Sequence, residues 1–236
     1  MKRAVERDPR KPDVPAQEAI PAGFLATLPG TAAARLLADA VRIDVPAGGT
    51  VYRDEERGRV IVVLHGLLRT YLSSPDGRQV TIRYTRSGEV VGLALVLGGP
   101  APITIQALTS ASVVALRIDV LRSLLETDPA VARACAEELA RQLFRAFDEI
   151  ADQAFLSVRQ RVARQLLDLA VHTDEGTLVA RVSQQELADA IASGREVVSR
   201  ALHELQGAGL VSPTRSGIVV RDPVGLSDET SRTGRG

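Results

Sequence analysis

The pattern of apolar and polar positions changes along the chain. Over residues 41–118, short apolar and β-branched runs recur, and turn-forming segments separate them. In residues 80–84, apolar residues alternate with polar ones, which is typical of a strand with one buried face. Asp76-Gly77 stands between two such runs and predicts a hairpin turn. Many short strands at this spacing predict an antiparallel sandwich or small barrel.

After residue 118 the apolar positions follow a helical period. Asp128 and Pro129 predict the start of a helix that runs to about Gln153, with no proline or glycine in between. Apolar residues at alternating three- and four-residue spacing form a narrow stripe flanked by charges, which favours the seam of a dimer. The predicted seam consists of Ala136, Leu139, Leu143, Ala146 and Ile150. The alternative is a helix that packs only on its own domain.

Residues 183–211 predict a helix, a tight turn and a second helix. Ser183 stands three residues before Glu186 in a capping-box arrangement, and Ser193-Gly194 interrupts the helical pattern. In the second helix, over residues 195–206, one face is apolar and the other is polar. The polar face carries Arg195, Glu196, Ser199 and Arg200. This pattern is typical of a helix-turn-helix, although an ordinary helical hairpin with solvated charges has the same periodicity.

The polar face also matches the chemistry of the DNA major groove. Arginine donates two hydrogen bonds to guanine, and glutamate accepts one from cytosine. We therefore predict that Arg195, Glu196, Ser199 and Arg200 read bases. Two short apolar runs around Pro213 and Gly217 predict a small hairpin, a wing that places Arg215 near a backbone phosphate.

On these features the chain resembles the Crp/Fnr superfamily, the cyclic-AMP receptor and fumarate–nitrate regulators. The resemblance covers residues 24–221 and rests on the strings LHGLLRTYL, SGEVVG, RQRVARQLLDLA, SQQELADAIASGREVVSRALHELQGAGLV and GIVV. It implies an α+β fold: an N-terminal antiparallel β-roll like that of cyclic-nucleotide-binding domains, a long dimerisation helix and a C-terminal winged helix-turn-helix. We expect a flexible tail at 1–22, the β-roll at 23–127, the dimerisation helix and hinge at 128–156, the DNA-binding domain at 157–222 and a second flexible tail at 223–236.

The resemblance further implies a homodimeric transcription regulator that binds double-stranded DNA at a twofold site with TGTGA-like half-sites. Ser183 and Gln185 match positions that contact phosphates in the family. RNA polymerase is a further expected partner.

The chain departs from the family where cyclic AMP binds. Leu93 follows Gly92 in place of a glutamate, and Ala101 and Pro102 replace an arginine and a serine. The positions that bond adenine correspond to Ala146 and Phe147. A buried phosphate without a positive partner is costly, so we expect no cyclic AMP binding in the usual mode. The degenerate effector pocket consists of Gly92, Leu93, Ala101, Pro102, Ile103, Ala146 and Phe147.

These substitutions do not identify what, if anything, binds in place of cyclic AMP. Leu93, Leu95, Leu97, Ile103, Phe147 and Ile150 form either a filled core, with a dimer that binds DNA without ligand, or an apolar pocket for another small effector. Haem binding through His65 is a weaker alternative. An alternative function is a sensor of another small effector that acts mainly through protein contacts.

Composition limits the remaining possibilities. The chain has 29 Lys+Arg and 29 Asp+Glu, so its zero net charge argues against a nonspecific polyanion binder. Its single cysteine, Cys135, excludes an intramolecular disulfide and cysteine-based metal sites. The histidines stand in no catalytic or metal-binding motif, so we expect no enzyme, no cofactor and no metal. Without a long apolar run or a signal-peptide core, we expect a cytoplasmic protein with no membrane segment.

Overall fold

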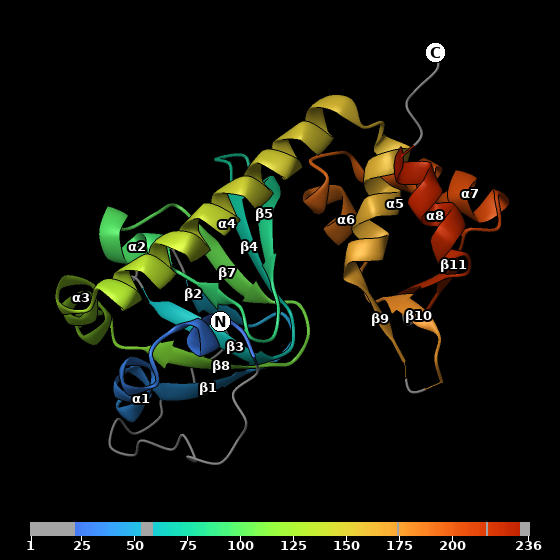
Figure 1. Cartoon of the computed structure of the whole chain (residues 1–236). Helices are drawn as coiled ribbons and strands as arrows, with labels where there is room; N and C mark the ends of the chain where they lie inside the picture. Colours follow the sequence, from blue (N-terminus) through green and yellow to red (C-terminus); the bar gives the residue numbers. More distant parts are fainter. Residues whose placement is uncertain (1–21, 53–58, 174, 216, 232–236) are drawn as a thin grey trace, which may run out of the picture. The chain divides into compact units, whose positions relative to one another are not determined.

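The structure is a computed structural model, and it describes residues 22–52, 59–173, 175–215 and 217–231. The chain divides into two compact units, each described separately below (Figure 1). The first unit comprises residues up to 70 together with 83–142, and the second comprises 71–82 and the residues from 143 onward. The element order is the predicted one: a β domain, a long helix and a helical unit with a small sheet. All but the last residue of the predicted tail at 1–22 lie outside the described residues.

Two four-stranded sheets form the β domain. The first contains, in spatial order, β1 (Val41–Val45), β8 (Ala111–Leu116), β3 (Val60–His65) and β6 (Val90–Val91). The second contains β2 (Thr50–Tyr52), β7 (Thr104–Ala107), β4 (Leu68–Ser73) and β5 (Gln79–Thr85). The pairs that join the first sheet are antiparallel, as predicted. The predicted turn between β4 and β5 is present, with Gly77 at φ 82° and its N–H donating to the Ser74 carbonyl at 2.9 Å.

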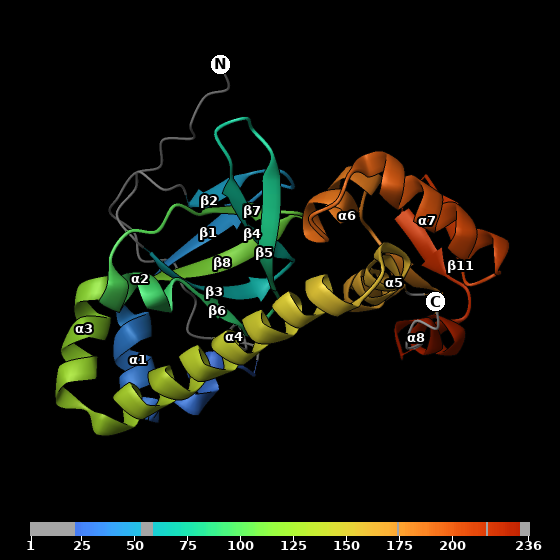
Figure 2. The same ribbon diagram turned by 90° about the horizontal axis from the view of Figure 1, so that it is seen from above.

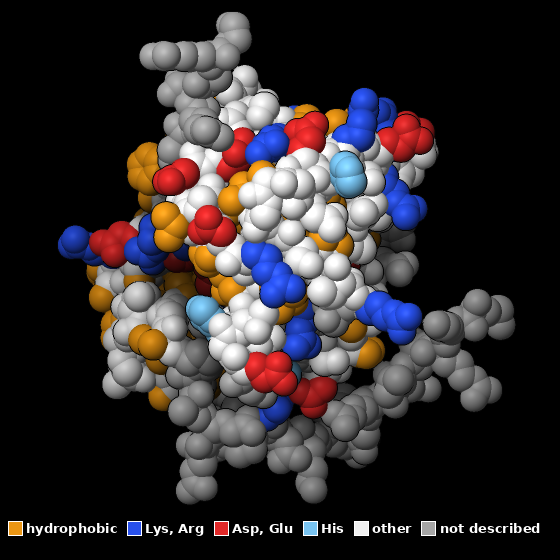
Figure 3. All heavy atoms as spheres, turned by 90° about the vertical axis from the view of Figure 1, so that its right-hand side faces the viewer, with side chains coloured by type: hydrophobic (Ala, Val, Ile, Leu, Met, Phe, Trp, Pro, Cys, Tyr) orange, Lys and Arg blue, Asp and Glu red, His pale blue; other side chains and the backbone are white. Residues whose placement is uncertain are grey.

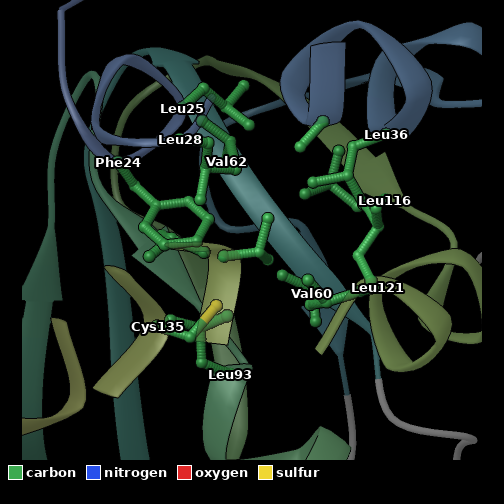
Figure 4. Packing of buried hydrophobic residues seen from close by; sticks show 14 of the residues in the cluster. Phe24, Leu25, Leu28, Leu36, Val60, Val62, Leu93, Leu116, Leu121 and Cys135 are labelled. Atoms are coloured by element: carbon green, nitrogen blue, oxygen red, sulfur yellow. The ribbon is translucent and has the colours of Figure 1, made fainter. Parts of the chain in front are cut away.

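Strand β3 explains why this domain has two cores. Val60 and Val62 pack into a helix-side core with the short N-terminal helices, whereas Ile61 and Val63 pack into an inter-sheet core. Successive strand residues point to opposite faces, so a strand covered on both faces is apolar at every position. The helix-side core is shown in Figure 4, where Leu93 lies beside Cys135.

Short helices cover the β domain. They are the 3-10 helix η1 (Phe24–Thr27) and the α-helices α1 (Gly30–Ala38), α2 (Leu93–Gly98) and α3 (Ile118–Thr127). Helices α1 and α3 pack against each other (Figure 2). The sequence did not predict α2. It follows Gly92, whose φ of 93° and close approach to the Arg59 carbonyl exclude any side chain at this position.

The long helix α4 (Pro129–Phe155) begins where the sequence predicts. The Asp128 carboxylate accepts a hydrogen bond from the backbone N–H of Ala130 at 3.0 Å, which caps the first turn. In its first half, Val131, Ala134 and Cys135 are buried in the helix-side core.

The second unit contains further helices around a small sheet. Its elements are α5 (Val158–Leu169), β9 (Ala170–His172), β10 (Leu178–Ala180), α6 (Gln184–Ala190), α7 (Arg195–Gly207), β11 (Val211–Thr214), β12 (Gly217–Val220) and α8 (Pro223–Ser231). The predicted hairpin is β11–β12, and it extends into a sheet with β10 and β9, which the sequence did not predict.

The prediction of a flexible tail at 223–236 is wrong for most of that range, which forms helix α8 (Pro223–Ser231). Leu226 is fully buried, and the Glu229 carboxylate accepts two hydrogen bonds from Arg159, at 2.9 and 3.1 Å. A single buried leucine and a carboxylate with a distant partner produce no helical period. The sequence pattern therefore could not reveal this helix.

Candidate nucleic-acid interface

Helix α6 is fixed at its start by the predicted capping box. The Ser183 hydroxyl accepts from the Glu186 backbone N–H at 3.1 Å, and the Glu186 carboxylate accepts from the Ser183 N–H at 2.7 Å. These bonds satisfy two donors that a helix start leaves unpaired. Leu187 and Ala188 are buried behind the cap, so α6 has one defined orientation in its unit.

Helix α7 separates its apolar and polar residues as predicted. Val198, Ala201, Leu202 and Leu205 are buried. Arg195, Glu196 and Arg200 are exposed, and Ser199 is half-buried. Residues at i, i+1, i+4 and i+5 lie on one side of a helix, so the four predicted base-reading residues share one accessible face. Helix α7 thus presents two guanidinium groups and a carboxylate on one face.

The turn between α6 and α7 contains backbone strain. Ala192 has φ 51°, a left-handed conformation that is costly for a residue with a Cβ atom. We expect Ala192→Gly to stabilise the second unit by about 0.5–1 kcal/mol, since glycine adopts this conformation without the Cβ clash. Urea unfolding monitored by circular dichroism measures this as a higher midpoint.

Ala208 provides the matched control for that substitution. It ends α7 with φ −80°, where alanine is unstrained, so Ala208→Gly should lower the midpoint or leave it unchanged. A midpoint that falls for Ala192→Gly as much as for Ala208→Gly would show that the turn is not strained.

The three predicted phosphate-contact residues are all exposed. Ser183 and Gln185 lie at the start of α6, where backbone N–H groups favour anions, and the Gln185 amide donates to the Asp189 carboxylate at 2.8 Å. Arg215 lies in the turn between β11 and β12. Their exposure is compatible with phosphate contact, and the Gln185–Asp189 bond would have to open if Gln185 turned toward DNA.

Charges of both signs are interspersed on the face of the molecule shown in Figure 3. Some arginines of the second unit form ion pairs with carboxylates of the same unit. Arg159 pairs with Glu229 at 2.9 Å and with Glu204 of α7 at 3.5 Å, and Arg164 pairs with Asp152 at 2.6 Å. Any selectivity for DNA must therefore come from the placement of exposed arginines rather than from a uniform basic surface.

The second half of α4 exposes large apolar side chains. Leu143 and Phe147 are each 53% exposed, and Ile150 is 63% exposed. Leu139, by contrast, packs against the helix-side core, so it is unsuited to the seam predicted for it. The exposed apolar residues that follow three- and four-residue spacing are Ala136, Ala140, Leu143, Phe147, Ile150 and Ala154, which we call the α4 stripe.

The predicted effector-pocket residues differ in burial and in the part of the chain's core that they contact. Leu93 is 2% exposed in the helix-side core, and Ala101 and Ile103 pack against the inter-sheet core. Pro102 is exposed. Ala146 and Phe147 are exposed on the second unit.

Other apolar residues near these positions also divide between core and surface. Leu95 is buried in the inter-sheet core, whereas Leu97 is 68% exposed, and Phe147 and Ile150 are exposed as well. The six residues predicted to form either a filled core or an apolar pocket therefore do not gather in one place in the single chain. Leu93 lies in the helix-side core, Leu95 and Ile103 lie in or against the inter-sheet core, and the other three are exposed.

Cys135 is buried beside Leu93, and burial raises the pKa of its thiol to about 11. The thiol is therefore protonated and unreactive near neutral pH, and Cys135 packs as a small hydrophobic residue.

Within the described ranges, no group of three His, Cys, Asp or Glu side chains is arranged to hold a metal ion. In the same ranges, no helix has the length and apolar character needed to cross a bilayer.

Two family models match the chain. One, described as a Crp-like helix-turn-helix domain, matches residues 160–229, and the other, a cyclic nucleotide-binding domain, matches residues 42–128. The transcriptional regulator LdrP of Thermus thermophilus is 32% identical over 185 residues, 76% of this chain and 92% of that protein. A CRP-like cAMP-activated global transcriptional regulator of Mycobacterium tuberculosis is 28% identical over 208 residues, 85% of this chain and 93% of that protein.

Solved structures have the same fold. The crystal structure of a CRP/FNR-family transcriptional regulator from Thermus thermophilus superposes with a TM-score of 0.71 at 27% identity. The match covers 82% of this chain and 100% of that chain.

Proposed function

The chain belongs to the Crp/Fnr family of transcription regulators, and we propose that it acts as a homodimer on a twofold DNA site. We further propose, from its own substitutions at the cyclic-AMP positions, that it does so without cyclic AMP. Its family consists of DNA-binding regulators rather than enzymes, and Crp family members bind DNA as dimers. The observation that carries the proposal is the polar face of α7, where Arg195, Glu196, Ser199 and Arg200 are accessible together.

This face supports a specific base-reading role. Arg195 and Arg200 each donate two hydrogen bonds to a guanine, and Glu196 accepts one from a cytosine. We assign these contacts to a TGTGA-like half-site, with Ser199 completing the set. Ser183, Gln185 and Arg215 contact backbone phosphates and fix the register of α7 in the groove. RNA polymerase is the expected protein partner once the dimer is on DNA.

The α4 stripe supports the homodimer. Large apolar side chains exposed at coiled-coil spacing are stabilised when they are removed from water. The same stripe on a second copy of the chain has the matching spacing to cover them. Phe144 and Phe147 form an edge-to-face pair with ring centroids 6.3 Å apart, which adds aromatic surface to the stripe. We assign the seam to Ala136, Leu143 and Ile150 from the sequence pattern, with Ala140 and Phe147 in place of Leu139 and Ala146.

The first unit supports the absence of cyclic AMP binding in the usual mode. Leu93 occupies the helix-side core, and neither Ala101 nor Pro102 offers a positive charge for a phosphate. Calorimetric titration of the full chain with cyclic AMP should therefore give no binding heat. A saturable micromolar isotherm would contradict this part of the proposal.

A second candidate function is a sensor of another small effector that acts mainly through protein contacts. The buried positions of Leu93 and Leu95 favour a protein that is DNA-competent without ligand, whereas the exposed Leu97 and Phe147 leave apolar surface for another occupant. The accessible polar face of α7 favours the DNA reader over this alternative.

Selection from random duplex DNA by the purified full chain tests the function. We expect the recovered sequences to contain two inverted TGTGA-like half-sites whose centres are about one helical turn, 10–10.5 base pairs, apart or a multiple of it. Recovery of unrelated sequences, or of sequences without twofold symmetry, would contradict the proposal.

A further inference from the structure

Helix α7 carries an exposed histidine on its polar face. His203 follows Ser199 by four residues and Arg200 by three, and residues at these spacings are neighbours on a helix surface. The two residues before it, Ala201 and Leu202, are buried, whereas His203 is exposed. The polar face that we assign to base reading therefore continues one turn further, to His203.

His203 lies further along α7 than the residues assigned to bases. An α-helix rises about 1.5 Å per residue, so His203 is about 12 Å beyond Arg195 and about 4.5 Å beyond Arg200 along the helix axis. The major groove is about 12 Å wide, and a recognition helix contacts base edges with its N-terminal residues. The third turn of such a helix therefore lies nearer to the edge of the groove, where the backbone phosphates are.

The carboxylates of α7 leave room for a phosphate beside His203. Glu204 is next to His203 in the sequence, and its carboxylate lies 3.5 Å from the Arg159 guanidinium of α5. Glu196 is seven residues before His203, which is two helical turns away on the same face. Protonation of His203 thus adds a positive charge to a face that already carries two arginines and one carboxylate.

The elements that pack against α7 contribute few other charges. They are α5, α6 and β11, and β11 has no charged residue. On α6, Glu186 belongs to the capping box, and Asp189 accepts from Gln185 at 2.8 Å. Both carboxylates of α6 therefore have donors of their own. The remaining charged residues of α5 are Arg161, Arg164, which pairs with Asp152 of α4, and Asp168.

We propose that His203 binds a DNA backbone phosphate in its protonated form, so that the affinity of this chain for DNA rises as the pH falls. The inference rests on the proposed DNA-binding function and adds a dependence on pH to it. Histidine is the side chain that ordinarily changes its charge between pH 5 and 8. A phosphate beside an imidazole favours the charged form, so binding takes up a proton wherever the imidazole is neutral before binding.

The sign of the effect follows from this proton uptake. A complex that holds more protons than its separate components becomes more stable as the pH falls. The gain begins where the bound imidazole becomes protonated, and it ends once the unbound imidazole is protonated as well. In the proposed dimer the effect occurs twice, once in each protomer.

Fluorescence anisotropy of the full chain at about pH 8 and about pH 6, at constant salt, tests the proposal with a TGTGA-like duplex and a scrambled duplex. We expect binding to be about 10-fold tighter at the lower pH, because about half a pKa unit at each of two histidines amounts to one power of ten. The change should be the same for both duplexes, since a phosphate contact carries no sequence information.

Two substitutions of His203 separate its charge from its shape. His203→Gln should bind at both pH values with the affinity of the wild type at the higher pH. His203→Lys keeps a positive charge, so it should bind at both pH values with the affinity of the wild type at the lower pH. Because His203 is exposed, the Tm of the DNA-free variants should not change.

The other two histidines of the chain are the matched controls. His65 on β3 and His172 on β9 are both exposed, and His65→Gln and His172→Gln should keep the wild-type dependence on pH. An equal dependence on pH in the wild type and His203→Gln, or an effect confined to the TGTGA-like duplex, would overturn the phosphate contact. Equal affinities of the wild type for the two duplexes would instead contradict the proposed function, while the response of both duplexes to pH still tests His203.

Discussion

Replacing Arg200 with alanine should remove most of the discrimination between a TGTGA-like site and the same site with its contacted guanine changed. A bidentate arginine–guanine contact contributes about 1–3 kcal/mol of discrimination, and a twofold site contains the contact twice. The substitution should leave the fold intact, because Arg200 is exposed and the apolar face of α7 is made by other residues. Fluorescence anisotropy with matched and changed duplexes measures the ratio of the two affinities.

Arg215→Ala is the informative comparison for Arg200→Ala. If Arg215 contacts a phosphate, its loss should weaken binding to all duplexes equally and reduce the salt dependence. Arg181 is exposed and is not among the predicted DNA contacts, so Arg181→Ala should change the affinity for either duplex little. Equal weakening of matched and changed duplexes by Arg200→Ala would mean that Arg200 contacts the backbone and does not read a base.

Replacing Phe147 with aspartate should convert the proposed dimer to monomers and weaken binding to the twofold duplex by about 100-fold or more. In the single chain Phe147 is half exposed, so the charge is tolerated there, but it would be desolvated in a seam of two stripes. In a dimer, binding of one protomer to its half-site raises the effective concentration of the other protomer at the second half-site. Separate protomers bind the two half-sites independently and therefore more weakly. Sedimentation equilibrium gives the oligomeric state, and anisotropy gives the DNA affinity.

The neighbouring Asp148 is exposed but lies off the α4 stripe, so Asp148→Ala is the matched control and should remain dimeric. A Phe147→Asp variant that sediments as a dimer with unchanged DNA affinity would place the interface elsewhere on the chain.

Much of the fold could be predicted because its signals are local. The strands of the β domain follow apolar runs with turn residues between them, and the starts of α4 and α6 follow side-chain caps at Asp128 and Ser183. The accessible face of α7 was predictable for the same reason, since the 3.6-residue period alone separates Arg195 and Arg200 from Val198 and Leu202.

The structural features that could not be predicted from the sequence depend on contacts between residues far apart in the chain. Helix α8 is fixed by the ion pair between Glu229 and Arg159, and the partial burial of Leu139 depends on which residues of the β domain pack against α4. Both apolar registers of α4 have coiled-coil spacing, so periodicity could not choose between Leu139 and Ala140.

Equilibrium titration of the ligand-free full chain with a twofold TGTGA-like duplex and with a scrambled duplex, at about 150 mM salt, tests the central claim most directly. The placement of a few arginines on a neutral protein predicts a large affinity ratio between the two duplexes, on the order of 10³ or more, in the absence of cyclic AMP. Equal affinities for the two duplexes, or selective binding only after cyclic AMP is added, would contradict it.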